Sequence, residues 1–207
     1  MHSIYKCAPR VKGIVGSAGL IVNTPSKAER ISFWQHAYAR ASFVEARLQC
    51  ELLINTNPTL NSTLRRALSV AIATLYCRPF KQRKAVRVRE DIVPAEFRAT
   101  HNDIIEIRDK SIAHRDLDAA VADWGFINQL RVNIDAGELT INTLSPIVAN
   151  EKVHELLPLL DALIAKMDAA SLEFINKYLV QMHAADGSYV VSLDDSPSAW
   201  LLPTSVK

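Results

Sequence analysis

Apolar residues recur every three or four positions in four separate stretches of the chain, which is the period of an amphipathic α-helix. The first stretch, 26–54, begins with Ser26 and has Glu29 three residues later, the arrangement of a helix N-terminal capping box. Trp34 and Tyr38 are interpreted as core residues, with a contact to a second copy as the alternative. The predicted core face of this helix consists of Ile31, Trp34, Tyr38, Ala41, Val44, Leu48 and Leu52.

Three further helices and one hairpin follow. A second helix is expected over about 59–76, with Pro79 ending it, and a third over about 94–114, with Pro94 in the tolerant first turn. The fourth is expected over about 150–182. Between the third and fourth helices, two segments alternate polar and apolar residues on either side of an Asp-Ala-Gly-Glu turn, which predicts a β-hairpin at about 129–144.

These elements predict the fold class. Four helices with short connections are typical of an antiparallel bundle, so we expect a mainly all-α fold of four to five helices with a small β-hairpin insertion. The bundle is expected to span 25–183. An irregular N-terminal arm at 1–24 and a loosely held C-terminal tail at 184–207 are expected to flank it.

Composition restricts the class of protein further. The chain has 207 residues, of which 49% are hydrophobic and 22% charged, as in a globular domain that buries a core without disulfides. The apolar run at 13–22 is too short and too glycine-rich for a signal peptide or a membrane span. We therefore expect a cytoplasmic protein with no membrane partner. Its three scattered cysteines are expected to be reduced thiols: Cys7, Cys50 and Cys77.

The sequence contains no recognisable motif for a metal or a cofactor. The six histidines form no metal-ligand pattern with cysteine or acidic residues, and the glycine-containing segment at 13–19 has the wrong flanks for a nucleotide-binding loop. No metal and no cofactor are therefore predicted. The net charge of +2 does not by itself indicate a nucleic-acid partner.

The third predicted helix carries the densest group of charged residues. Its end, 108–116, places three cations, two carboxylates and an imidazole directly after an isoleucine-rich stretch. At about 100° per residue, Arg108 and Arg115 fall within the apolar arc of that helix, whereas Asp109 and Lys110 fall on the opposite side, where solvation explains them. Arg108 is interpreted as a structural ion pair, an anion ligand at an opening, or a surface cation whose stem lies on the protein.

His114 falls about 120° from Arg108 on the same wheel, so the two side chains do not share one face of an isolated helix. A histidine at the end of a helix is most simply a favourable cation near the C-terminal dipole. Cooperation with Arg108 would require a frayed helix end or a second copy of the helix across a dimer.

The segment Glu106–Asp116, EIRDKSIAHRD, resembles the motif of HEPN-domain proteins, in which an arginine and a polar residue precede a histidine. The matching residues here are Arg108, Asp109 and His114, with five residues between the arginine and the histidine. The segment is most similar to HEPN relatives linked to abortive-infection and toxin–antitoxin systems. The resemblance covers 26–182 in helical layout and this short segment in detail.

The resemblance implies a homodimer that cleaves RNA without a metal, by attack of a ribose 2′-hydroxyl on the adjacent phosphate. His114 would then be the general acid or base, Arg108 would hold the phosphate, and Asp109 would orient one of them. Some HEPN relatives are non-catalytic modules that bind nucleotides, RNA or proteins, so enzymatic activity, like an antitoxin or other protein partner, stays open.

A basic surface is also implied by the resemblance. Lys110, Arg115 and the cations of the loop 81–89 would follow the RNA backbone. A solvated run of charge is the alternative interpretation of the loop. Its cations are Lys81, Arg83, Lys84, Arg87 and Arg89.

Overall fold

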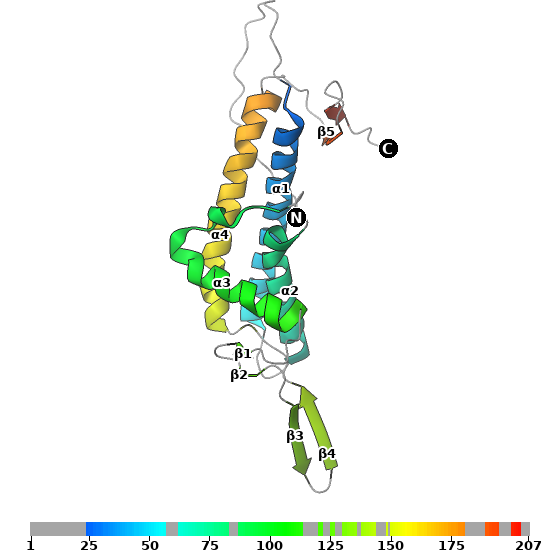
Figure 1. Ribbon diagram of the computed structural model, residues 1–207, viewed down its shortest axis with the longest axis vertical. Helices are drawn as coiled ribbons and strands as arrows, with labels where there is room; N and C mark the ends of the chain where they lie inside the picture. The colour runs from blue at the N-terminus through cyan, green and yellow to red at the C-terminus, as the bar shows by residue number, and fades with distance from the viewer. Residues whose placement is uncertain are drawn as a thin grey trace, which may run out of the picture.

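A computed structural model of the protein describes residues 24–56, 62–82, 87–113, 120–121, 125–126, 130–135, 138–143, 148, 150–180, 189–194 and 200–203. Within these ranges the fold is mainly helical, as expected. Its α-helices are α1 (Lys27–Asn55), α2 (Ser62–Lys81), α3 (Arg98–Glu106) and α4 (Asn150–Phe174). α1 packs along both α2 and α4, and the short α3 crosses one half of the bundle (Figure 1).

Ion pairs along α1 and α4 show that these two helices run in opposite directions. Glu29 at the start of α1 meets Lys177 beyond the end of α4, Arg40 pairs with Asp168, and Arg47 pairs with Asp161 farther along. Exposed pairs of this kind each contribute only about 0–1 kcal/mol to stability. Their order nevertheless matches the antiparallel packing predicted from the sequence.

The two ends of α1 are held by different polar groups. At its start, the Ser26 backbone N–H donates to the Glu29 carboxylate over 2.9 Å and the Ser26 hydroxyl accepts from the Glu29 N–H, which confirms the capping box. At its end, the buried Arg65 of α2 donates to the carbonyls of Leu53 and Thr56, each over 3.1 Å. The Leu53 carbonyl also accepts from the Thr56 N–H over 3.2 Å, so the bonds from Arg65 add to the hydrogen bonding at a helix end, where intrahelical partners run out.

The buried face of α1 differs from the predicted one. Trp34, Leu48 and Leu52 are 39%, 36% and 54% exposed. A second apolar stripe, about 140° away by the helical period, lies in the core instead. It has smaller residues, which let α2 and α4 approach closely. The fully buried members of this stripe are Ala39, Phe43, Ala46, Cys50 and Leu53.

The larger of the two hydrophobic core clusters in the described part of the chain receives residues from all four α-helices, including Phe43 of α1, Phe80 of α2, Ile104 of α3 and Leu160 of α4. α2 extends beyond its predicted end, because Pro79 lies within its last turn and the chain stays helical to Lys81. No helix in the described part of the chain is long and apolar enough to cross a lipid bilayer.

The predicted hairpin is present. β3 (Leu130–Asp135) and β4 (Glu138–Thr143) pair antiparallel, from Leu130 opposite Thr143 to Asp135 opposite Glu138. This hairpin extends away from the helices in Figure 1. A smaller antiparallel pair, β1 (Ala120–Val121) with β2 (Gly125–Phe126), lies between the end of the third helix and this hairpin in the chain.

Two described segments of the expected C-terminal tail, 189–194 and 200–203, contain short strands. The π-helical segment η5 (Ile175–Val180) continues α4, and β5 (Tyr189–Val191) pairs antiparallel with β6 (Leu201–Pro203). Trp200 is buried against Phe174 and Tyr178, with ring centroids 6.2 Å from each. Residues 189–194 and 200–203 of the expected tail therefore include a paired strand each, and Trp200 is buried. The arm expected at 1–24 lies outside the described residues, apart from position 24.

Candidate functional site

The charged segment of the third helix has unusual backbone geometry. The 3₁₀ turns η1 (Glu90–Ile92) and η2 (Ala95–Phe97) precede α3, and the π-helical segment η3 (Ile107–Ala113) follows it. Hydrogen bonds from i to i+5 widen each turn, so a wheel drawn at about 100° per residue does not hold beyond Ile107. π-Helical turns within helices occur frequently at functional sites.

Asp109 links two cations from different helices. Its Oδ1 accepts a 2.7 Å hydrogen bond from Nη1 of Arg108, and its Oδ2 lies 3.1 Å from Nζ of Lys81 at the end of α2. Partial burial raises the pKa of Asp109, but the hydrogen bonds from Arg108 and Lys81 outweigh that effect and hold the pKa below its ordinary value. We call these three residues the Asp109 bridge. It carries one net positive charge from two cations and one carboxylate.

The Asp109 bridge corrects one interpretation of the helical wheel: Asp109 is not merely solvated, because it connects η3 to α2. For Arg108, the sequence left open an ion pair, an anion ligand and a surface cation. Its side chain is 32% exposed and pairs with the next residue in the chain. Because a guanidinium has five N–H donors, Arg108 retains donors for an additional acceptor.

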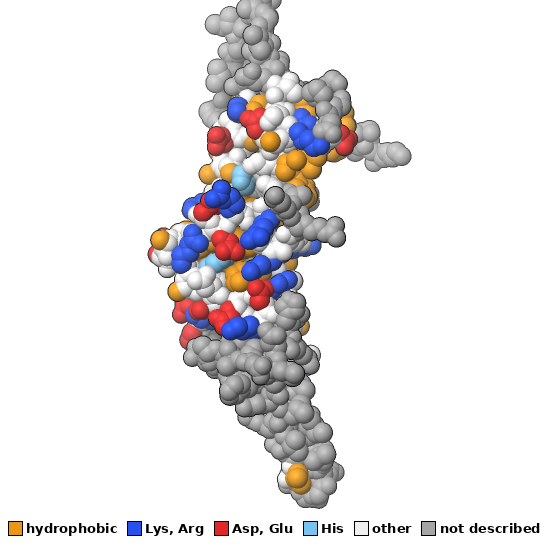
Figure 2. Space-filling model, viewed as in Figure 1, with side chains coloured by type: hydrophobic (Ala, Val, Ile, Leu, Met, Phe, Trp, Pro, Cys, Tyr) orange, Lys and Arg blue, Asp and Glu red, His pale blue; other side chains and the backbone are white. Residues whose placement is uncertain are grey.

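The other candidate cations that the structure describes each pair with an acidic neighbour. Lys110 pairs with Glu106 one turn earlier in the helix. Nη2 of Arg87 lies 3.8 Å from Oε1 of Glu90, and Nε of Arg89 lies 3.0 Å from Oδ2 of Asp91. These last four side chains line an open hollow of about 470 Å³. Figure 2 shows basic and acidic side chains interspersed over the middle of the visible face, so no uniformly basic patch forms there.

Four of the candidate site residues cannot be placed relative to the Asp109 bridge. His114 and Arg115 follow the last described residue of η3, and Arg83 and Lys84 fall between α2 and the described stretch that begins at 87. All four lie outside the described residues. The described candidates that the structure does bring together are Lys81, Arg108 and Asp109.

A buried thiol lies beneath the Asp109 bridge. The Cys77 sulfur donates a weak 3.7 Å hydrogen bond to the Ile104 carbonyl. Burial raises the pKa of Cys77 to about 12, although the positive charge of Arg108 partly opposes that increase. Cys77 therefore remains a protonated thiol near neutral pH and is not a nucleophile.

His101 is the other chemically notable residue of the third helix. Its side chain is fully buried, its Nδ1 shares a 2.7 Å hydrogen bond with the Tyr76 hydroxyl, and its Nε2 lies 3.9 Å from the Glu90 carboxylate. Burial lowers the pKa of His101. A neutral imidazole enclosed in this way has a structural role, because no substrate can reach it.

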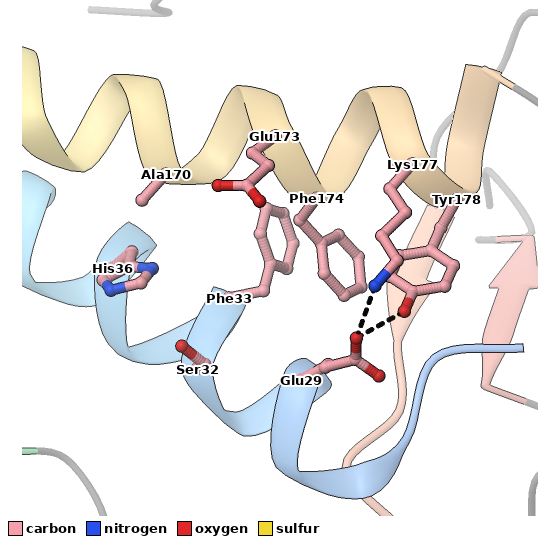
Figure 3. A pocket seen from close by; sticks show the side chains of 9 residues that line it. All are labelled: Glu29, Ser32, Phe33, His36, Ala170, Glu173, Phe174, Lys177 and Tyr178. Carbon is pink, nitrogen blue, oxygen red and sulfur yellow. Dashed lines mark hydrogen bonds and ion pairs between the residues drawn. The ribbon is translucent and has the colours of Figure 1, made fainter.

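A pocket between α1 and the α4–η5 helix was not anticipated from the sequence (Figure 3). Its volume is about 160 Å³. The contributing residues are far apart in the chain, and only Glu29 had been identified, as a capping residue. No local sequence signal joins the two groups, because helix packing alone brings them together. The lining residues are Glu29, Ser32, Phe33, His36, Ala170, Glu173, Phe174, Lys177 and Tyr178.

Neither a metal site among the described residues nor a similar protein indicates what the chain does. Among the residues that the structure describes, no three histidine, cysteine or acidic side chains are grouped so as to hold a metal ion. No family model, curated protein or solved structure matches the chain. Its function must therefore be inferred from the chemistry of its own residues.

Proposed function

We propose that the protein is a HEPN-like, homodimeric ribonuclease that cleaves RNA without a metal ion, in a prokaryotic defence or toxin–antitoxin setting. The observation that carries this proposal is the Asp109 bridge at the π-helical end of the third helix. It couples an accessible arginine to a carboxylate within the segment that resembles the HEPN motif. Its net positive charge suits a phosphate.

Each residue of the motif has a chemical role in this proposal. The free donors of Arg108 would bind the non-bridging phosphate oxygens and stabilise the charge that develops on them. Asp109, ionised because Arg108 and Lys81 lower its pKa, would hold both cations in place. His114 would take the proton from the ribose 2′-hydroxyl or give one to the departing 5′-oxygen.

The chemistry explains why a second copy would be useful. The bond from the 2′-oxygen to phosphorus forms as the bond from phosphorus to the 5′-oxygen breaks. The 2′-oxygen loses a proton in this step, and the departing 5′-oxygen gains one. The reaction therefore requires one base and one acid, whereas the motif of each chain supplies one histidine, His114. Two protomers with their motifs facing each other would supply both.

A specific observation favours a second candidate function, a non-catalytic module that binds RNA, a nucleotide or a protein. Lys110, Arg87 and Arg89 each pair with an acidic neighbour, so the described basic residues around the motif contribute little net positive charge. Tight tracking of an RNA backbone requires many unneutralised cations. A module of this kind would retain binding without His114 but lose affinity without Arg108.

The deciding experiment is cleavage of RNA by the purified full chain in the presence of EDTA. We expect Arg108→Ala and His114→Ala each to lower the rate by about 100-fold or more. Matched controls are Arg66→Ala and His154→Ala, which remove exposed side chains from α2 and α4 and should leave the rate unchanged.

Three outcomes separate the candidates. Absence of cleavage by the unaltered protein, or equal cleavage by all variants, would contradict the nuclease proposal. RNA or nucleotide binding that survives His114→Ala but weakens in Arg108→Ala would then identify the module. If Arg108→Ala lowers only the stability of the fold, the Asp109 bridge is a structural ion pair.

A further inference from the structure

The pocket between α1 and the α4–η5 helix is separate from the Asp109 bridge. Its residues come from the first turns of α1 and from the last turns of α4 and η5. α3 crosses the other half of the bundle (Figure 1). A ligand in this pocket would therefore be recognised independently of the proposed RNA chemistry.

One wall of the pocket is aromatic and firmly supported. Phe33 and Phe174 stack with ring centroids 4.3 Å apart and planes 12° from parallel. The Tyr178 ring continues this wall, with its centroid 4.9 Å from that of Phe174. The Trp200 ring packs edge-on against both Phe174 and Tyr178. The cavity of about 160 Å³ matches the roughly 150 Å³ of an apolar protein cavity that accepts benzene. A single six-membered ring is therefore the right size of ligand body.

At one end of the pocket, the charged side chains of Glu29 and Lys177 pair with each other. Glu29 Oε1 accepts from Lys177 over 2.8 Å and from the Tyr178 hydroxyl over 2.6 Å, as Figure 3 shows. The bond from Lys177, followed by those from Tyr178 and Ser26, holds the pKa of Glu29 far below its ordinary value. Glu29 in turn raises the pKa of Lys177. An incoming anion would have to break this ion pair before it could use Lys177.

One turn before Lys177, a second carboxylate of the pocket has no such partner among the described residues. Glu173 makes no hydrogen bond or ion pair with any residue that the structure describes, and it is exposed at the mouth of the pocket. His36 lies nearby on α1, where burial lowers its pKa and the charge of Glu173 opposes that decrease. With His36 neutral, the lining carries Glu29, Glu173 and Lys177 as its charges, a sum of minus one.

We propose that this pocket binds a small organic cation in which a primary ammonium group is joined by a short linker to a compact aromatic or apolar body. The body would pack on Phe33 and Phe174, two of the aromatic residues that line the pocket. The ammonium group would pair with Glu173 and gain from the adjacent ring faces. A neutral analogue would lose the charge of the ammonium partner in this pairing, and an anionic analogue would be repelled by Glu173.

Benzylamine is the probe that tests this pairing, with benzyl alcohol and benzoate as neutral and anionic analogues of the same ring. Binding would be followed by NMR titration of the isotope-labelled full chain. We expect saturable shifts with benzylamine, confined to residues near the pocket, and weaker binding of both analogues. Glu173→Gln should weaken benzylamine binding about tenfold, the factor expected when one charge-assisted contact is replaced by a neutral one.

Two further variants make the test specific. Glu45→Gln removes an exposed carboxylate elsewhere on α1 and should leave the affinity for benzylamine unchanged. Ala170→Phe places a ring in the cavity and should abolish binding while the protein remains folded. If Ala170→Phe does not fold, Glu173→Gln and the analogue series still decide the question.

The proposal is overturned if benzylamine does not bind, if Glu173→Gln binds it as tightly as the unaltered protein, or if benzoate binds more tightly. Retained binding in a folded Ala170→Phe variant would also overturn it. Arg108→Ala should not change benzylamine binding, because the two regions are separate.

Discussion

In the part of the chain that the structure describes, two clusters of aromatic side chains each have a histidine and a glutamate beside them. In the closed cluster, Phe43, Tyr76 and Phe80 surround His101, and all four side chains are fully buried. In the open cluster, Phe33, Phe174, Tyr178 and Trp200 pack together with His36 nearby, and a pocket remains at their edge. Similar residue types thus form a filled core in one place and a concave surface in the other.

The difference lies in how many elements cover each cluster. α1, α2 and α3 enclose the closed cluster, so His101 finds a hydrogen-bond partner in Tyr76 within the core. The open cluster lies between the ends of two helices and a short β-pair, and Glu173 stays exposed. Aromatic residues beside a histidine and an acid therefore indicate a binding site only where the packing leaves them accessible.

The largest expected difference between the clusters is in stability. Phe43→Ala would leave a cavity in the filled core and should lower the free energy of unfolding by about 3–5 kcal/mol. Phe33→Ala removes a half-buried ring at the pocket edge and should cost about half as much, because less contact is lost. Urea denaturation followed by circular dichroism measures both. Equal losses would show that the open cluster is packed as tightly as the closed one.

A smaller difference is expected when a single hydroxyl is removed from each cluster. Tyr76→Phe leaves the Nδ1 of buried His101 without its partner and should cost about 1–3 kcal/mol of unfolding free energy. Tyr178→Phe should cost less than about 1 kcal/mol, because Glu29 keeps Lys177 and Ser26 as partners near the surface. The comparison fails if Tyr178→Phe proves the more damaging substitution in the same urea titration.

The smallest expected effect is a dependence of stability on pH. Burial lowers the pKa of both His101 and His36 below the ordinary value of 6.5. Below that pH the unfolded chain binds protons that the folded chain resists, so the free energy of unfolding should decrease on acidification and level off above it. The ionised Glu29 would begin to contribute a similar loss only below its ordinary value of 4.5.

The two histidines can be separated by substitution. We expect His36→Gln to retain most of the decrease between about pH 7.5 and 5.5, because His101 is the more deeply enclosed of the two. Urea midpoints across that pH range provide the measurement, with His154→Gln as the exposed control. Loss of the whole pH dependence in His36→Gln would assign it to the open cluster instead.

Local sequence features predicted a large part of the fold. The capping box of Ser26 and Glu29 and the strand pairing at 130–143 follow from residues close together in the chain, and both were predicted correctly. The predicted core face of α1 was wrong because that helix has two apolar stripes, and periodicity cannot rank them. The stripe with smaller side chains became buried, which leaves Trp34 and Leu52 exposed.

The candidate sites were harder to predict than the fold. The wheel placed Asp109 on the solvated side of the helix, whereas in the structure Asp109 pairs with the neighbouring Arg108 and with Lys81 of α2. The contact with Lys81 depends on how the two helices pack. The pocket gave no sequence signal, since Phe33 and Phe174 meet only when α1 and α4 pack antiparallel.

The amino-acid sequence alone establishes the helical class, the start of α1, the hairpin and the position of the charged motif, because each depends on propensity and hydrogen bonding between near neighbours. The buried face of α1, the Asp109 bridge and the pocket depend on contacts between residues distant in the chain. Such contacts are selected by the packing of whole helices, in which side-chain volume and the number of covering elements decide which groups are buried and which remain accessible.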